Sequence, residues 1–416
     1  MKMQNLKRSF QIVQEMQNGG ELIDTIRLQS ADFSDDDYVD FDNEYKCLGG
    51  CFEPGENRKV YWARMPERNF TIYTIKDEGK NYYRYSNEYY KNEEIHKILQ
   101  KYRLPAQFGD TLNEETRIDP NVRKGFDIPL ADHIKVERDV IDKVSKAFAN
   151  ATGLNSVRVE PYKINIYEQG DFFKAHRDSP SKDLIATIVL HVSGERKVFV
   201  VDGQKWDDND DYHESDLCIF FTDVLHEVKP CKDYRETVTF KVFKAAETVP
   251  TDKVVSDNAK RIANRIQINK PFGVLLQHGY TYIDIADKPT FKGLDEKLAT
   301  ALDELGVKYA LLPVIVKNRH NFKEGQEMRW FSNEEREEYN GDPEEVSNLY
   351  IYNLSEKLVH LLEMKEWKKV SMDTTVYYLG MGFKVGEKME TELYVGNQYD
   401  GTAIENIYLN VMLHSV

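Results

Sequence analysis

The sequence predicts an α+β protein whose mainly β core is a double-stranded β-helix, or jelly roll, braced by helices, with an additional C-terminal α/β domain. Between residues 163 and 243, short strand-like segments follow one another with turn residues between them, a pattern typical of jelly rolls and small barrels. Beyond residue 261, strand-like and helix-like segments alternate. An ordinary β-sandwich is the alternative that the same strand pattern allows.

The chain is too long, at 416 residues, for one average domain. We expect an N-terminal region at 1–100 (helix, acidic loop and tyrosine-rich hairpin), a β domain at 101–246, a linker at 247–260 and a C-terminal α+β domain at 261–416. The linker is expected because its residues are polar and interrupted by proline. For the C-terminal domain, a second, metal-free barrel is an open alternative.

The N-terminal region carries three patterns. Residues 1–20 predict a short amphipathic helix with Leu6, Phe10 and Val13 on one face, and they lack the apolar run of a secretory signal. The acidic run at 32–45 predicts a solvated loop. The segment YWARMPERNFTIYTIKDEGKNYYRY predicts a hairpin with its turn at Asp-Glu-Gly, and we expect its aromatic side chains to pack rather than to stack nucleobases.

The β domain combines one helix with several strands. Residues 136–153 place Val140, Val144 and Phe148 at helical spacing and end at Gly153, so we expect a helix that braces the barrel. DLIATIVLHVS and SDLCIFFTD predict strands buried on both sides. KINIY and RETVTFKVF alternate instead: one face is polar (Lys163, Asn165, Tyr167, Arg235, Thr237, Thr239 and Lys241) and the other is apolar (Ile164, Ile166, Val238, Phe240 and Val242). A polar strand face suits a barrel interior that holds a charged small molecule.

Two segments, YEQGDFFKAHRD and HEVKPCKDYRET, carry the candidate site. His176 and Asp178 are two residues apart, so on a strand both side chains leave the same face. With His226 they would make a triad of two imidazoles and one carboxylate, which leaves three positions of an octahedral metal open, as in non-haem Fe(II) oxygenases. Arg235, nine residues beyond His226, offers a charged fork for a carboxylate. These residues predict an oxygenase that uses iron and a dicarboxylate co-substrate.

A longer ordered pattern contains these residues: Tyr167, Gly170, Phe173, His176, Asp178, His226, Pro230, Arg235 and Thr237. It resembles the catalytic domain of the Fe(II)/2-oxoglutarate-dependent dioxygenases, in particular the prolyl-4-hydroxylase-like branch. The resemblance implies iron at His176, Asp178 and His226, and the distal carboxylate of 2-oxoglutarate at Arg235, with Tyr167 and Thr237 as further contacts. It also implies O2 as co-substrate, succinate and CO2 as products, and ascorbate as an optional reductant.

The resemblance extends from about residue 104 to the end of the chain and is strongest between 162 and 243. The chain departs from the family pattern at two places. Phe173 stands where many relatives carry Tyr, and GERKVFVVDGQKWDDND replaces the Gly-Gly-Glu-Thr segment that commonly precedes the distal histidine. The second departure leaves the rim that faces the substrate undefined.

Three functions are open from the sequence: a hydroxylase of prolyl or other protein side chains, an oxygenase of a small molecule or modified nucleobase, and a catalytically silent scaffold on the same fold. We favour the first, with a protein or peptide as substrate. A net charge of −15 disfavours a polyanionic partner, because nucleic-acid enzymes present basic surfaces to phosphates. The sequence leaves the oligomeric state open.

The remaining composition sets outer bounds. No run of 18 apolar residues occurs, so no membrane span is expected. Four scattered cysteines favour an intracellular location, cytoplasmic or nuclear. Cys47 and Cys51 are expected to be free thiols, and His278 and His360 are expected to be core histidines rather than ligands.

Overall fold

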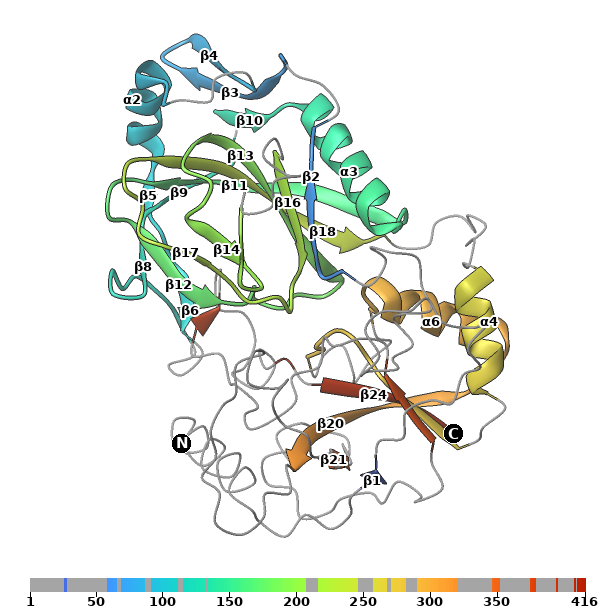
Figure 1. Ribbon diagram of the computed structural model, residues 1–416. Coiled ribbons are helices and arrows are strands. Elements are labelled where there is room, and N and C mark those ends of the chain that lie inside the picture. The colour runs from blue at the N-terminus through green and yellow to red at the C-terminus, as the bar shows by residue number, and fades with distance from the viewer. Residues whose placement is uncertain are drawn as a thin grey trace, which may run out of the picture.

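The computed structural model describes residues 26–27, 58–65, 69–86, 91–110, 115–131, 133–206, 216–245, 257–267, 271–281, 290–319, 346–351, 375–378, 394–395, 408 and 410–416. This part of the chain is mostly β with few helices (Figure 1). None of its helices combines the length and apolar character needed to cross a lipid bilayer. The predicted N-terminal helix, the acidic run, Cys47, Cys51 and His360 lie outside the described residues.

The larger sheet of the N-terminal half has seven strands, and every neighbouring pair is antiparallel. In spatial order the strands are β2 (Val60–Ala63), β16 (Leu217–Phe221), β13 (Leu184–Gly194), β18 (Arg235–Lys244), β11 (Val157–Tyr167), β9 (Phe126–Pro129) and β5 (Leu104–Pro105). The four strands predicted from DLIATIVLHVS, SDLCIFFTD, KINIY and RETVTFKVF are therefore confirmed.

A second antiparallel sheet packs against the first. Its five strands, in spatial order, are β15 (Gln204–Lys205), β14 (Phe199–Val201), β17 (His226–Val228), β12 (Phe172–His176) and β8 (Arg123–Lys124). The rings of Phe220 on β16 and His226 on β17 have centroids 4.5 Å apart, and those of Phe199 on β14 and Phe220 are 6.1 Å apart. The two sheets thus enclose a common interior (Figure 1), and we call these two sheets together the barrel.

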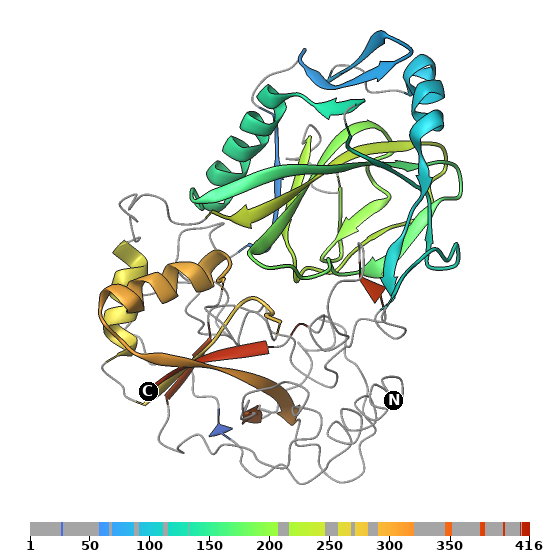
Figure 2. The same cartoon turned by 180° about the vertical axis from the view of Figure 1, so that it is seen from behind.

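Helix α3 (Arg138–Thr152) covers the other face of the seven-stranded sheet, beside β11 and β2 (Figure 2). Val140, Val144 and Phe148, predicted to face the sheet, are fully buried. The helix ends at Gly153, whose φ of 74° lies in the left-handed region that glycine adopts without strain, and the Gly153 N–H donates to Ala149 O. The predicted bracing helix is confirmed in position and end.

The predicted tyrosine-rich hairpin is also confirmed. Strands β3 (Thr71–Asp77) and β4 (Lys80–Tyr85) are joined by Glu78 and Gly79, both at positive φ, as tight hairpins require. β10 (Ile134–Val136) pairs with β3. Helix α2 (Glu93–Tyr102) is capped at its N-terminus by Asn92, whose side chain accepts from the Ile95 N–H. Strand β2 belongs to the seven-stranded sheet, so strand pairing crosses the boundary predicted at residue 100.

The C-terminal part contains a mixed sheet and two helices. Its strands, in spatial order, are β1 (Ile26–Arg27), β21 (Val346–Ile351), β20 (Tyr309–Arg319), β24 (Asn410–Ser415), β19 (Phe272–Leu275) and β22 (Thr375–Tyr378). Helices α4 (Asp257–Ile266) and α6 (Gly293–Glu304) pack on each other. The last four residues of the predicted linker, 257–260, belong to α4, because Ala259, Ile262 and Ala263 give this polar stretch a buried face.

A small sheet connects the two halves of the chain. It consists of β23 (Tyr394–Val395), β6 (Phe108–Asp110) and β7 (Glu115–Arg117), all antiparallel. Cys218 and Cys231, the cysteines in the described part, are free and buried.

Candidate functional site

The two histidines of the candidate triad face each other across neighbouring strands. His176 ends β12 and His226 begins β17, and the two residues are directly paired in the antiparallel register. An irregularity in this pairing lies between Phe173 and His176. The imidazole centroids are 4.2 Å apart, and both residues are buried. The fold therefore brings these two predicted ligands into contact inside the barrel.

Hydrogen bonds to the backbone determine which ring nitrogen of each histidine remains available. His176 Nδ1 lies 2.7 Å from Lys174 O, and His226 Nδ1 lies 2.9 Å from Val224 O. A carbonyl oxygen only accepts, so each Nδ1 carries the proton and each Nε2 keeps its lone pair. Burial lowers the pKa of both imidazoles, that of His176 far below its ordinary value. Both rings are thus neutral and oriented by backbone carbonyls, the state in which histidine binds metals.

Asp178 is buried close to this pair. Its carboxylate raises the pKa of His226, although burial of that ring has the larger, opposite effect. Asp178 Oδ2 accepts a short hydrogen bond from the Thr187 hydroxyl on β13. Within the described residues, no group of three or more His, Cys, Asp or Glu side chains has the arrangement of a preformed metal site. The two neutral imidazoles are suitable ligands for a divalent cation, whereas one oxygen of the Asp178 carboxylate accepts the hydrogen bond from Thr187.

Arg235 is a buried cation with no carboxylate partner in the described part of the chain. The residue is 1% exposed, its Nη1 donates to Glu195 O at 2.9 Å, and its Nε has no partner. The guanidinium carbon lies 5.0 Å from the ring centroid of Phe199 and 5.6 Å from that of Trp206. Burial lowers the pKa of Arg235 to about 10. Burying an unpaired charge costs several kcal/mol, so this position favours an anion.

The backbone at Arg235 is unusually close to its neighbour strand. Gly194 on β13 pairs with Arg235, has a φ of 82°, and a Cβ there would lie 2.0 Å from Tyr234 O. Only glycine permits this approach, which lets the Glu195 carbonyl reach the guanidinium.

The two further predicted contacts, Tyr167 and Thr237, lie next to Arg235. Tyr167 on β11 pairs with Arg235 and is buried, and it hydrogen-bonds Arg123. Thr237 follows two residues after Arg235 on the same strand face and is also buried. Phe199 connects this group to the histidines, since its ring centroid lies 6.2 Å from that of His226. The structure therefore gathers all six predicted residues in one interior.

The sequence reasoning missed a group of buried charges in the same interior. Asp127 on β9 accepts from Arg123 at 2.6 Å, Lys163 at 2.8 Å and Asn165 at 2.8 Å. Burial lowers the pKa of Lys163 to about 8, and Arg123 acts in the same direction. The alternation of Lys163, Asn165 and Tyr167 indicated a polar face, but nothing in the sequence paired that face with Asp127.

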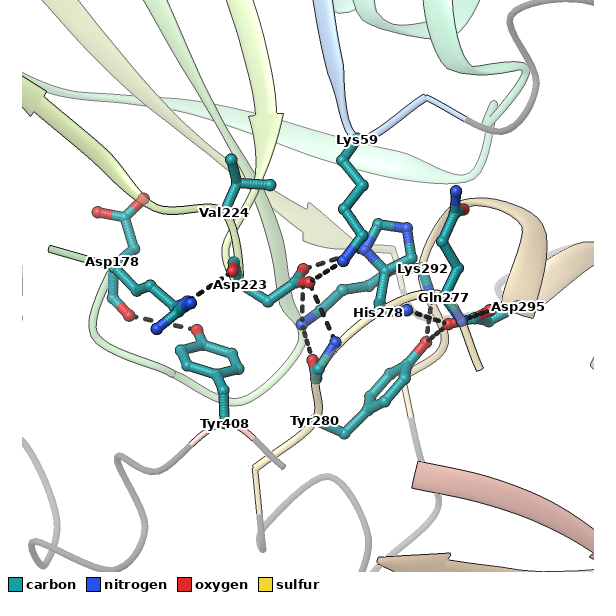
Figure 3. A network of polar contacts seen from close by, with 12 residues as sticks. Lys59, Asp178, Asp223, Val224, Gln277, His278, Tyr280, Lys292, Asp295 and Tyr408 are labelled. Atoms are coloured by element: carbon teal, nitrogen blue, oxygen red, sulfur yellow. Dashed lines mark hydrogen bonds and ion pairs between the residues drawn. The ribbon is translucent and has the colours of Figure 1, made fainter. Parts of the chain in front are cut away.

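A second missed group lies where the barrel meets the C-terminal part (Figure 3). Asp223, three residues before His226, accepts from Lys59 at 3.1 Å and from Gly279 N at 3.0 Å, and its Oδ1 lies 3.0 Å from His278 Nδ1. Burial alone would raise the pKa of Asp223, but Lys59, His278 and Lys292 hold it well below its usual range. His278 is buried, as predicted for a core histidine, but its partner is this carboxylate.

Comparisons with known proteins give partial similarities. No protein-family model matches the chain, and no curated protein matches it. Among solved structures, a Pseudomonas putida prolyl-4-hydroxylase is 17% identical over 37% of this chain and 83% of its own, with a TM-score of 0.28. A Trichoplax adhaerens prolyl hydroxylase, solved with a hypoxia-inducible-factor peptide, is 15% identical over 36% and 74%, with a TM-score of 0.26. A Burkholderia pseudomallei oxidoreductase of the 2OG-Fe(II) oxygenase family is 14% identical over 37% and 80%, with a TM-score of 0.24. The structural similarity to these proteins covers only part of this chain.

Proposed function

We propose that this protein is an Fe(II)- and 2-oxoglutarate-dependent dioxygenase that hydroxylates a protein side chain, in the manner of a prolyl hydroxylase. One observation carries the proposal: a neutral, backbone-oriented histidine pair shares a buried interior with an arginine that has no carboxylate partner among the described residues. A cation ligand set beside an anion site is what a metal with a dicarboxylate co-substrate requires.

In this proposal His176, His226 and Asp178 hold iron, and Arg235 binds the distal carboxylate of 2-oxoglutarate, with Tyr167 and Thr237 as neighbouring donors. The metal, when bound, would activate O2, the oxidant: one oxygen atom would go to the substrate and the other to succinate, as 2-oxoglutarate loses CO2. The seven- and five-stranded sheets would form the double-stranded β-helix of residues 101–246, joined by β2 from the N-terminal region.

The residues of the chain itself perform binding and orientation. The Lys174 and Val224 carbonyls fix the two imidazoles, and the Thr187 hydroxyl holds the Asp178 carboxylate. Phe199 and Phe220 pack near His226, and Phe199 and Trp206 lie near Arg235. Such apolar surroundings would strengthen electrostatic attraction to an anion.

A protein or peptide is the substrate we favour, because a net charge of −15 disfavours a nucleic acid. Two alternatives remain from the sequence: a small molecule or modified nucleobase as substrate, and a catalytically silent scaffold. The experiment below distinguishes them.

Anaerobic titration of the metal-free protein with Fe(II) and 2-oxoglutarate tests the proposal. We expect a visible charge-transfer band in the wild type and none in His176→Ala, Asp178→Ala or His226→Ala, because each variant lacks one proposed ligand. His96→Gln is the control, since His96 is a buried histidine of α2 outside this interior. Absence of the band in wild-type protein that retains bound iron would favour the scaffold. With the band present, peptide and small-molecule libraries, scored by mass for the gain of one oxygen atom, identify the substrate class.

A further inference from the structure

Hydrogen bonds outside the strand ladder hold the backbone segments that carry the proposed ligands. Arg177 lies between His176 and Asp178 in sequence, and its Nε donates to Asp223 O at 2.8 Å. Asp223 in turn precedes His226 by three residues. The Arg177–Asp223 bond therefore ties the two ligand-bearing segments to each other, independently of the direct pairing of β12 with β17.

A second bond reaches the same region from the end of the chain. The hydroxyl of Tyr408 donates to Asp178 O at 3.2 Å (Figure 3). Tyr408 is 230 residues from Asp178, so this contact exists only when the C-terminal part is docked on the barrel. It acts on the backbone of a proposed ligand rather than on a surface loop.

The Asp223 side chain is the anchor of this arrangement. Lys292 Nζ lies 3.7 Å from Asp223 Oδ1, donates to Gly279 O at 3.0 Å, and lies 5.0 and 5.1 Å from the ring centroids of Tyr280 and Tyr408. Asp223, His278 and Lys292 are all buried. A buried carboxylate surrounded by donors from the C-terminal part has little freedom to move, and its own backbone carbonyl is the acceptor for Arg177.

If this network served only to dock the C-terminal part on the barrel, the contacts of the Asp223 carboxylate would be sufficient. Here two additional hydrogen bonds end on the carbonyl oxygens of Asp178 and Asp223, the backbone next to the proposed ligands. Positions of ligand side chains follow from the positions of their backbone segments, and small displacements of ligands weaken metal binding.

We propose that Asp223, Arg177 and Tyr408 are positioning residues through which the C-terminal part of the chain sets the relative placement of the His176–Asp178 segment and His226. This inference rests on the proposed metal-binding function. It assigns to the C-terminal part a role in the competence of the metal site, in addition to any role in substrate recruitment.

Two tyrosine variants of the full-length protein form a matched test. Tyr408→Phe removes the hydroxyl that donates to Asp178 O, whereas Tyr280→Phe removes a hydroxyl of the same network that donates to Asp295 at 2.7 Å, away from both ligand segments. The measurement is calorimetric titration of the metal-free protein with Co(II), a redox-inert substitute for Fe(II), together with thermal unfolding of each metal-free variant. We expect Tyr408→Phe to raise the Co(II) dissociation constant roughly 2- to 10-fold, the range that corresponds to one net hydrogen bond.

Tyr280→Phe is expected to leave the Co(II) dissociation constant at the wild-type value, even if it lowers the thermal midpoint. Asp223→Asn, which keeps the shape of the side chain and removes its charge, is expected to weaken Co(II) binding more than Tyr408→Phe. Equal Co(II) affinities for Tyr408→Phe, Asp223→Asn and Tyr280→Phe, in a wild type that binds Co(II), would overturn the positioning role and leave the proposed function intact. A wild type that binds no divalent metal would overturn the proposed function itself.

Discussion

Arg235 shows how a single residue can be costly for folding and useful for binding. Its strand, β18, lies between β11 and β13, and its buried guanidinium has no carboxylate partner in the described part of the chain and an unsatisfied Nε. Such a group is retained against its desolvation cost only if something compensates for it. A bound dicarboxylate would do so, and it would stabilise the folded state by mass action.

We therefore expect Arg235→Met to separate the two effects. The variant should lose about 2–5 kcal/mol of 2-oxoglutarate binding free energy, as when one partner of a buried charge pair is truncated. Its free energy of unfolding without ligand should stay level or rise, because an unpaired buried charge is removed. Calorimetric titration and urea denaturation measure the two quantities, with Arg196→Met as the control cation. Unchanged affinity would show that another residue binds the co-substrate.

Asp127 makes stability depend on pH. Burial alone would raise the pKa of this carboxyl, but Arg123 and Lys163 hold it below its ordinary value. As the pH falls, the unfolded chain binds this proton before the folded chain does. The stabilisation is therefore complete above the unfolded pKa, about 4, and is lost as the pH falls through the lower folded pKa.

Asp127→Asn should remove this part of the acid sensitivity. It should also destabilise the protein at neutral pH by about 3–5 kcal/mol, because Arg123 and Lys163 lose their carboxylate. Urea midpoints measured from about pH 3 to pH 7 test both statements. Asp119→Asn, in a local turn, is the control. If the urea midpoint of Asp127→Asn fell with pH as it does in the wild type, another group would be responsible for the acid sensitivity.

At the scale of elements, the two faces of strand β18 have different roles: one lines the interior and the other binds the β3–β4 hairpin. Arg235 and Thr237 face the interior, whereas Glu236 between them faces the hairpin β3–β4, where it accepts from Tyr73 and, at 3.2 Å, from Arg84. Tyr234 also donates to Glu236, at 2.9 Å. This buried carboxylate fastens the hairpin to the outside of the barrel.

Glu236→Gln should thus lower stability without altering the interior. Removal of the carboxylate that pairs with buried Arg84 is expected to cost about 3–5 kcal/mol in urea denaturation. The dissociation constants for Co(II) and 2-oxoglutarate, measured where the variant is folded, should match those of the wild type. A large loss of ligand affinity in the folded variant would contradict the separation of the two faces.

Elements with strong local patterns were predictable from sequence, and relations between elements were less so. The alternation in β18, the hairpin turn at Glu78 and Gly79, and the helix ending at Gly153 each follow from local rules. The spacing of His176 and His226 suggested proximity, but their direct register depends on strand pairing. The bond from Thr187 to Asp178 and the donors around Asp223 join residues distant in sequence, and no local pattern records them.

At the scale of the whole molecule, strand pairing and hydrogen bonds cross the domain boundary expected at residue 100. β2 completes the edge of the seven-stranded sheet, and Tyr73 and Arg84 complete the partners of Glu236. A fragment that begins at residue 101 would expose the edge of β16 and would leave the buried Glu236 carboxylate without Tyr73 and without its cation, Arg84.

We accordingly expect fragment 101–416 to be insoluble or aggregated, while fragment 58–416 retains the described contacts of the barrel. Soluble yield, followed by size-exclusion chromatography and circular dichroism, compares the two fragments. A monomeric, folded 101–416 fragment with the thermal midpoint of the longer one would show that the N-terminal strands contribute little.

The pairing of His176 with His226 also has a consequence for the order of events during folding. The two residues are far apart in sequence, and the chain between them contains β13 and β16, which pair with each other in the other sheet. Such non-local contacts close late, because loop entropy must be overcome first. Unlike in a zinc finger, where the ion nucleates the structure, the proposed metal would bind here after the two histidine-bearing strands have paired. The rate at which refolding protein gains the ability to bind Co(II) would then equal the rate at which the barrel closes.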